Sequence, residues 1–193
     1  MQINPQMLRG NWATGWALDL HTLRSKALDD GTFETEHTEI GHALYMLKYR
    51  CDRTQVEPIA EAASDFLKGR PFFDGLEAII PVPPSEMDRP FEPVWELALA
   101  IGRKLDLSVP LQYLMKVKRT RALKEIEHRQ SRREELSGAF RVKDQRFARK
   151  WVLLFDDLFR SGETLNEIAY VLLTEGKVSG VFVLTVTKTR TKR

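Results

Sequence analysis

Apolar residues along the chain are spaced as expected for alternating strands and helices. Short apolar runs at 78–82, 151–155 and 181–186 are typical of strands covered on both faces. Elsewhere apolar residues recur every three or four positions, which indicates amphipathic helices. These helical patterns run from Ile40 to Cys51, Ile59 to Leu67, Val94 to Leu105 and Leu165 to Leu173, and further strands are expected at 109–114 and 139–142.

The order of these elements predicts an α/β fold. Strand–helix–strand–strand–helix–strand favours a central, mainly parallel sheet flanked by helices and joined by right-handed crossovers. We expect one domain over 1–193, with a core at 36–193 and a small N-terminal hood or cover segment at 1–35. Ligands of such sheets bind at the carboxyl ends of the strands, so the loops that follow 78–82, 109–114 and 151–155 are the candidate site.

Composition narrows the class of protein. The 193 residues are 42% hydrophobic and 30% charged, which is ordinary for a globular domain. Cys51 is the only cysteine, which excludes an internal disulfide and a cysteine zinc site. No apolar run approaches the ~20 residues of a membrane helix, and Asn4, Pro5 and Arg9 stand where a signal peptide would be apolar. We therefore expect a soluble, cytoplasmic protein with no membrane partner, for which a homodimer is an open option.

Charge leaves the partner open. The formal net charge is +3 and the pI is about 9.0. A mildly basic surface suits a polyphosphate substrate and equally suits weak nucleic-acid binding. Nucleic acid is therefore an alternative partner that nothing else in the sequence supports.

The segment 152–165 carries the clearest chemistry. Asp156 and Asp157 follow the apolar run, and paired carboxylates there are costly unless they bind something, such as the vicinal hydroxyls of a sugar. The next residues, 160–164, open a helix, whose free N–H groups and positive dipole end favour a phosphate. Together these features predict a ribose 5-phosphate site. The alternative is that the two acids only end a strand and cap a helix.

This segment resembles the signature of type I phosphoribosyltransferases, which bind 5-phosphoribosyl 1-diphosphate (PRPP). The signature is written as four apolar residues followed by D-D-V-x-T-T-G-x-T. Matching positions are held by Asp156, Asp157, Leu158, Ser161, Gly162 and Thr164. Arg160 replaces the usual Thr or Asp, and its guanidinium could reach the 5-phosphate or crowd it.

Within that superfamily the chain is similar to the ComF (competence-protein) family. The similarity covers about 40–187 and involves Pro81-Val82-Pro83, Arg89-Pro90-Phe91, Gln130, Arg132 and 136–140, with Glu135 where the pattern has Asn. Many ComF-like proteins begin with a four-cysteine zinc ribbon, which this chain lacks. A DNA-uptake role is therefore an alternative by analogy only.

The resemblance implies a set of site residues and a cofactor. Asp156 and Asp157 would be catalytic, holding the ribose hydroxyls and stabilising the ribosyl cation, and Mg²⁺ would be held mainly through PRPP rather than by protein ligands. The 5-phosphate loop would be Arg160, Ser161, Gly162, Glu163 and Thr164. The pyrophosphate loop would be Val82, Pro83, Pro84 and Ser85 with Arg89 nearby, unless it is only a proline-rich turn.

A mobile loop within 116–133 would cover the site. Lys116, Lys118, Arg119 and Arg121 are its candidates to meet pyrophosphate, and a solvated basic face is the alternative. Trp12 and Trp16 could stack on an acceptor base or serve in packing. The predicted function is Mg²⁺-dependent transfer of ribose 5-phosphate from PRPP to a nitrogen acceptor. A PRPP or nucleotide sensor without turnover is the alternative.

Overall fold

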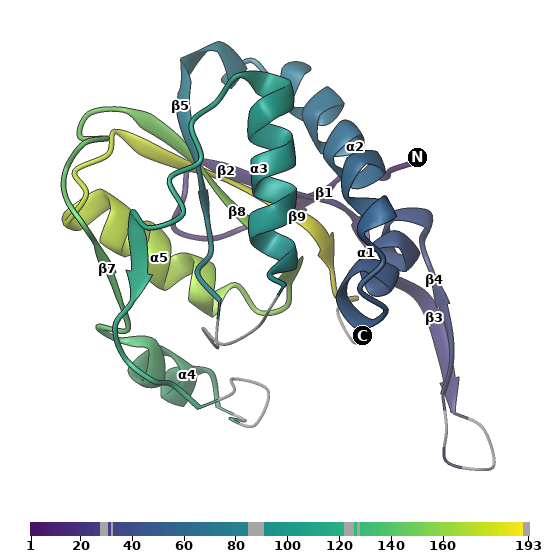
Figure 1. Cartoon of the computed structure of the whole chain (residues 1–193). Helices are drawn as coiled ribbons and strands as arrows, with labels where there is room; N and C mark the ends of the chain where they lie inside the picture. The colour runs from purple at the N-terminus through teal and green to yellow at the C-terminus, as the bar shows by residue number, and fades with distance from the viewer. Residues whose placement is uncertain (28–30, 32, 85–90, 122–125, 127, 191–193) are drawn as a thin grey trace.

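A central sheet of mainly parallel strands organises the chain. The computed structural model describes residues 1–27, 31, 33–84, 91–121, 126 and 128–190. Within them the largest sheet has five strands in the order β1-β2-β9-β8-β5 (Figure 1). These strands are β1 (Gln6–Leu8), β2 (Thr14–Leu20), β5 (Leu76–Pro81), β8 (Trp151–Phe159) and β9 (Gly180–Lys188), and only the edge strand β1 pairs antiparallel. The expected α/β fold is thereby confirmed.

Three helices cover one face of the sheet. They are α1 (Glu39–Tyr49), α2 (Val56–Lys68) and α3 (Pro93–Leu105), and Figure 1 shows them in front of the strands. Thr38 begins α1, because its hydroxyl accepts the N–H of Gly41 at 3.0 Å. The buried side chains of these helices pack with those of Leu153 and Phe155 from β8. Burial of these apolar side chains is the main force holding the helices on this face.

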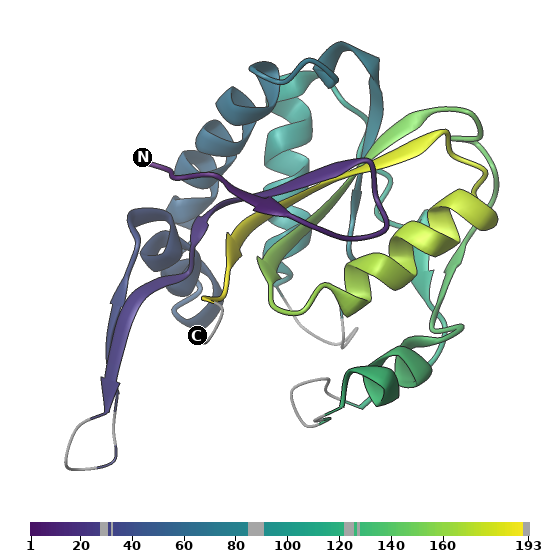
Figure 2. The same ribbon diagram turned by 180° about the vertical axis from the view of Figure 1, so that it is seen from behind.

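One long helix, α5 (Glu163–Thr174), covers the opposite face (Figure 2). Its Leu165, Ile168 and Leu172 pack with Val152 and Leu154 of β8 in a second apolar cluster. A two-stranded ribbon of β6 (Leu114–Lys116) and β7 (Phe140–Val142) lies on the same side, with α4 (Arg129–Leu136) between its strands in the chain. The sheet is therefore buried on both faces, as the continuous apolar runs predict.

The N-terminal segment differs from the expected hood. Residues 6–8 and 14–20 form strands of the central sheet, with β2 paired parallel to β9. Only β3 (Thr22–Ala27) and β4 (Phe33–His37) form a ribbon that extends away from the sheet in both figures. Residues 14–20 therefore belong to the central sheet and do not form a cover.

Several element boundaries were predicted wrongly. No strand spans 109–114, where only Ser108 bridges to Ala78 before β6 begins at Leu114. Cys51 lies beyond α1, exposed and with a φ of 53°. Asp52 accepts the Thr54 N–H and caps a short 3-10 turn, η1 (Arg53–Gln55), ahead of α2. A second 3-10 turn, η2 (Phe73–Gly75), precedes β5.

In the part of the chain that the structure describes, no helix is both long and apolar enough to cross a membrane.

Candidate functional site

The two acids lie inside β8 and not in the loop after it. The strand continues to Phe159, because Asp156 pairs in register with Thr185 of β9 and Leu158 pairs with Thr187. Successive side chains of a strand point to opposite faces. Asp156 therefore shares the α5 face with Leu154, while Asp157 shares the α1 face with Phe155.

Asp156 lines a pocket on the α5 face. One of its carboxylate oxygens accepts the backbone N–H of Asp157 at 2.8 Å. Burial, and next the neighbouring charge of Asp157, raise the pKa of Asp156 from 3.8 to about 7. At neutral pH this carboxyl group is divided between an acceptor form and a donor form, and both can bind a hydroxyl group.

Asp157 is held by a lysine that the sequence analysis did not single out. The Lys48 ammonium of α1 lies 2.6 Å from Oδ2 of Asp157, and both side chains are largely buried. Burial lowers the pKa of Lys48, but the facing Asp157 carboxylate more than offsets this and raises that pKa above its usual value. Lys48 therefore stays an ammonium cation at neutral pH. Lys48 directly follows buried Leu47, so its place beside the apolar stripe of α1 was the only available signal.

His21 completes the surroundings of this pair. Its Nδ1 lies 3.2 Å from the hydroxyl of Thr187, which is two residues beyond the β9 partner of Asp156. Burial lowers the pKa of His21 to about 4, and the charges of His37 and Lys48 add to this effect. The imidazole is thus neutral at pH 7.

The predicted 5-phosphate loop joins β8 to α5 as expected. Gly162 precedes the helix with a φ of 79°, in the left-handed region that glycine adopts without strain. No side chain caps the first turn of α5, which leaves N–H groups of that turn to bind an anion. Arg160, Ser161 and Thr164 line the same pocket of about 650 Å³ as Asp156. The structure thus brings one acid and the loop together.

Glu163 plays a different part from its loop neighbours. Its carboxylate is almost fully buried and lies 3.0 Å from Nε of Arg133 on α4. This ion pair fastens α4 to the first turn of α5. It also brings Arg132, the residue before Arg133, to the wall of the pocket, and Arg190 beyond β9 lines the pocket too. Neither arginine was among the predicted site residues, although Arg132 belongs to the ComF-like motif.

The predicted pyrophosphate loop is described only in part. Val82 continues the edge of β5, where its N–H donates to Phe155 O at 2.9 Å. Pro83 is buried and Pro84 half-buried, and the described residues contain no cis peptide bond. Ser85 and Arg89 lie outside the described residues. Their assignment to pyrophosphate remains a prediction.

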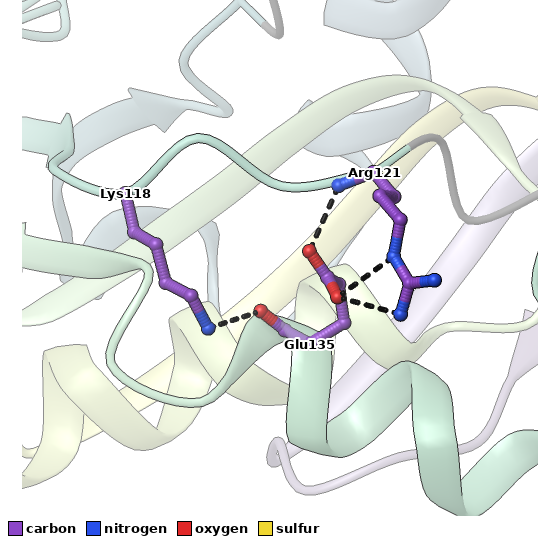
Figure 3. A network of polar contacts seen from close by, with 3 residues as sticks. All are labelled: Lys118, Arg121 and Glu135. Atoms are coloured by element: carbon purple, nitrogen blue, oxygen red, sulfur yellow. Dashed lines mark hydrogen bonds and ion pairs between the residues drawn. The ribbon is translucent and has the colours of Figure 1, made fainter.

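The predicted covering loop is anchored to Glu135 (Figure 3). Arg121 donates its backbone N–H to one carboxylate oxygen of Glu135 at 2.8 Å and its guanidinium to the other at 3.3 Å. Lys118 donates to the backbone carbonyl of Glu135 at 2.9 Å. Lys116 lies in β6, and Arg119 is largely exposed. These four residues do not line the pocket that holds Asp156.

Two further expectations concern aromatic residues and metal. Trp16 stacks on Phe72 at a centroid distance of 5.6 Å, which is a packing role, and Trp12 packs against the α5-side cluster. Among the described residues no three His, Cys, Asp or Glu side chains come together as a metal site. That Mg²⁺ is held mainly through PRPP stays a prediction.

Similarity to known proteins is remote. Neither a protein-family model nor a curated protein matches the sequence. Similar solved structures include a UMP synthase from Leishmania donovani, with 17% identity, a TM-score of 0.42, and coverage of 85% of this chain and 28% of that one. Another is an orotate phosphoribosyltransferase from Francisella tularensis, with 16% identity, a TM-score of 0.43, and coverage of 86% and 75%. At these values neither similarity assigns a chemistry to this chain, which spans little more than a quarter of the UMP synthase.

Proposed function

We propose that this protein has the type I phosphoribosyltransferase fold and transfers ribose 5-phosphate from PRPP to a nitrogen acceptor with release of pyrophosphate. The observation that supports this proposal most directly is that Asp156 and the uncapped N-terminus of α5 line one pocket. A carboxyl group for the ribose hydroxyls and a phosphate cradle are thereby joined at the end of a parallel strand. Ligands of α/β sheets bind in that place.

In this proposal each residue has a limited task. The first turn of α5, with Ser161 and Thr164, binds the 5-phosphate, and Asp156 binds a ribose hydroxyl. Asp157 lies on the opposite face of β8 and does not line the pocket, so it contributes negative charge only from across the strand, toward a transition state that has oxocarbenium character by analogy with glycosyl transfer. Its pairing with Lys48 limits that charge in the free protein. The bound PRPP would bring Mg²⁺, which neutralises the leaving pyrophosphate.

The test is release of pyrophosphate from PRPP and Mg²⁺ in the presence of a panel of nitrogen bases. Turnover with any base supports the transferase. The double variant Asp156→Asn with Asp157→Asn should abolish PRPP binding. Loss of folding in this variant would favour purely structural acids, and absence of PRPP binding by the folded wild-type protein would overturn the proposal.

One observation favours a second candidate, a PRPP or nucleotide sensor without turnover. In the free protein Asp157 is already bound by Lys48, and Arg121 is already bound by Glu135. Groups needed for transfer are thus occupied by the protein itself. Tight PRPP binding without turnover across the whole panel would support the sensor, with the same Asp156 dependence.

A further inference from the structure

The pocket at the phosphate loop carries more positive charge than one phosphate needs. Three arginines are among the described residues that line it, and they come from three parts of the chain. Arg160 belongs to the loop itself, Arg132 to α4 and Arg190 to the segment after β9. A phosphate monoester carries at most two negative charges near neutral pH.

The acids of the pocket do not offset this charge. Glu163 lies in the wall, but its carboxylate faces Arg133, a fourth arginine outside the lining. The pKa of Asp156 is raised to about 7, mainly by burial, so this carboxyl group is only partly charged at neutral pH. The three lining arginines therefore exceed the charge of the acids and of one bound phosphate.

The pocket is also larger than a phosphate cradle. Its volume of about 650 Å³ lies within the roughly 300–1,000 Å³ of pockets that enclose whole drug-sized ligands. Besides the polar loop it is lined by Leu158, Phe159 and Thr189, so it extends past the first turn of α5 toward the end of β9. Arg190 lies in this extension.

Contacts within the protein fix the two outer arginines. Nε of Arg132 donates to the carbonyl of Ile126 at 2.7 Å, and its neighbour Arg133 is held by Glu163. One terminal nitrogen of Arg190 donates to the carbonyl of Leu23 on β3. A guanidinium has five N–H donors, so each arginine keeps donors for a ligand. Arginine is well suited to bind phosphate through two such donors at once.

We propose that this pocket takes a ribose that carries a 5-diphosphate, as in a nucleoside 5′-diphosphate, with the second phosphate bound by Arg132 and Arg190. The first phosphate would occupy the N-terminus of α5, and Asp156 would hold a ribose hydroxyl. This proposal rests on the proposed function, because it places the ribose at Asp156 and the first phosphate at the N-terminus of α5 in the same way. It adds a ligand class that PRPP, with a single 5-phosphate, does not represent.

The experiment compares AMP with ADP by calorimetric titration without Mg²⁺ at fixed ionic strength. The two probes share base and ribose and differ by one phosphate. We expect ADP to bind at least about tenfold more tightly than AMP. Arg132→Ala and Arg190→Ala should each remove most of this preference while changing AMP affinity less than about threefold. Arg103→Ala, at an exposed position of α3, is the control and should change neither.

Equal affinities for AMP and ADP would overturn the inference, as would equal losses for both probes in Arg132→Ala. If PRPP still bound in an Asp156-dependent manner, the proposed function would stand and only the inference would fail. If PRPP, AMP and ADP all failed to bind, both would fail. If a 5′-phosphorylated oligonucleotide bound more tightly than ADP, with steep salt dependence, the inference would be overturned and the ligand of the pocket would be the phosphorylated end of a nucleic acid.

Discussion

Nζ of Lys48 lies 2.6 Å from Oδ2 of Asp157, and this ion pair joins α1 to the strand that carries both acids. The lysine side chain is 25% exposed and that of the aspartate 13%. Asp156 points to the other face of the sheet, so Lys48 makes its ion pair with Asp157, while its charge acts on Asp156 only at longer range and lowers the pKa of that carboxyl group slightly. The two carboxyl groups therefore differ: Asp157 is paired with an ammonium group, whereas burial raises the pKa of Asp156 to about 7.

Lys48→Met should lower the free energy of unfolding by about 1–3 kcal/mol at pH 7. Removing one partner of a buried pair costs about 3–5 kcal/mol because the other charge stays unpaired, and partial exposure reduces this. Lys104→Met is a matched control, because Lys104 is 27% exposed but pairs with Glu57 and Glu61, which are 62% and 59% exposed. That change should cost clearly less, because exposed ion pairs contribute little to stability. Urea unfolding measures both, and equal losses would contradict a special role for the Asp157 pair.

Asp156 and His21 should give opposite slopes of stability against pH. The pKa of Asp156 is raised from 3.8 to about 7, so the folded state binds more protons and stability falls as pH rises from about 4 to 7. The pKa of His21 is lowered from 6.5 to about 4, so the unfolded state binds more protons and stability rises between those values. Each slope is at most about 1.4 kcal/mol per pH unit.

Single variants separate the two slopes. In Asp156→Asn the opposing slope of Asp156 is absent, so stability should rise more steeply between pH 4.5 and 6.5 than in the wild type. In His21→Asn the reverse holds, and stability should fall over the same interval relative to the wild type. Urea unfolding at pH 4.5, 5.5 and 6.5 measures both. Three parallel profiles would show that neither group titrates with a shifted pKa.

The sequence predicts the sheet better than it predicts the site. The spacing of apolar residues and the length of apolar runs identify the buried strands and helices, because hydrophobic burial leaves a local pattern in the chain. The end of β8 was misplaced, since aspartate is rare in strands and the apolar run stops at Phe155. The ladder continues only because Thr185 and Thr187 lie alongside, and such pairing is set by the tertiary structure.

The charged partners of the site were not predictable for a similar reason. Lys48, Arg132 and Arg190 lie in segments that look like ordinary solvated positions. Their importance depends on which element packs beside them, as when the Glu163–Arg133 pair brings α4 to the phosphate loop. The loop at 160–164 was found because its signal is local: a strand, a glycine and a helix start in direct succession.

Glu135→Gln should increase affinity for pyrophosphate about two- to fivefold, if the loop at 116–121 binds that anion. The carboxylate of Glu135 now takes the guanidinium and the backbone N–H of Arg121 (Figure 3), and an uncharged amide would compete less well with a ligand anion. Glu134→Gln removes the same charge from the same helix without an Arg121 contact and serves as control. If calorimetric titration showed equal effects of the two changes, the gain in affinity would come from the loss of one negative charge and not from release of Arg121.

Gly162→Ala should weaken PRPP binding at least tenfold and destabilise the protein by about 2–3 kcal/mol. The residue has a φ of 79°, and an added Cβ would lie 2.9 Å from Cε2 of Phe159, inside the pocket wall. Gly138→Ala is the matched control, because φ is also positive, at 67°, but no atom lies within 4 Å of the added Cβ. It should cost only the conformational strain of about 1–2 kcal/mol and leave PRPP binding intact. Urea unfolding measures the stability of both variants, and calorimetry measures their PRPP binding. If both variants lost the same modest amount of stability and still bound PRPP, close packing of the phosphate loop on Phe159 would have no part in binding.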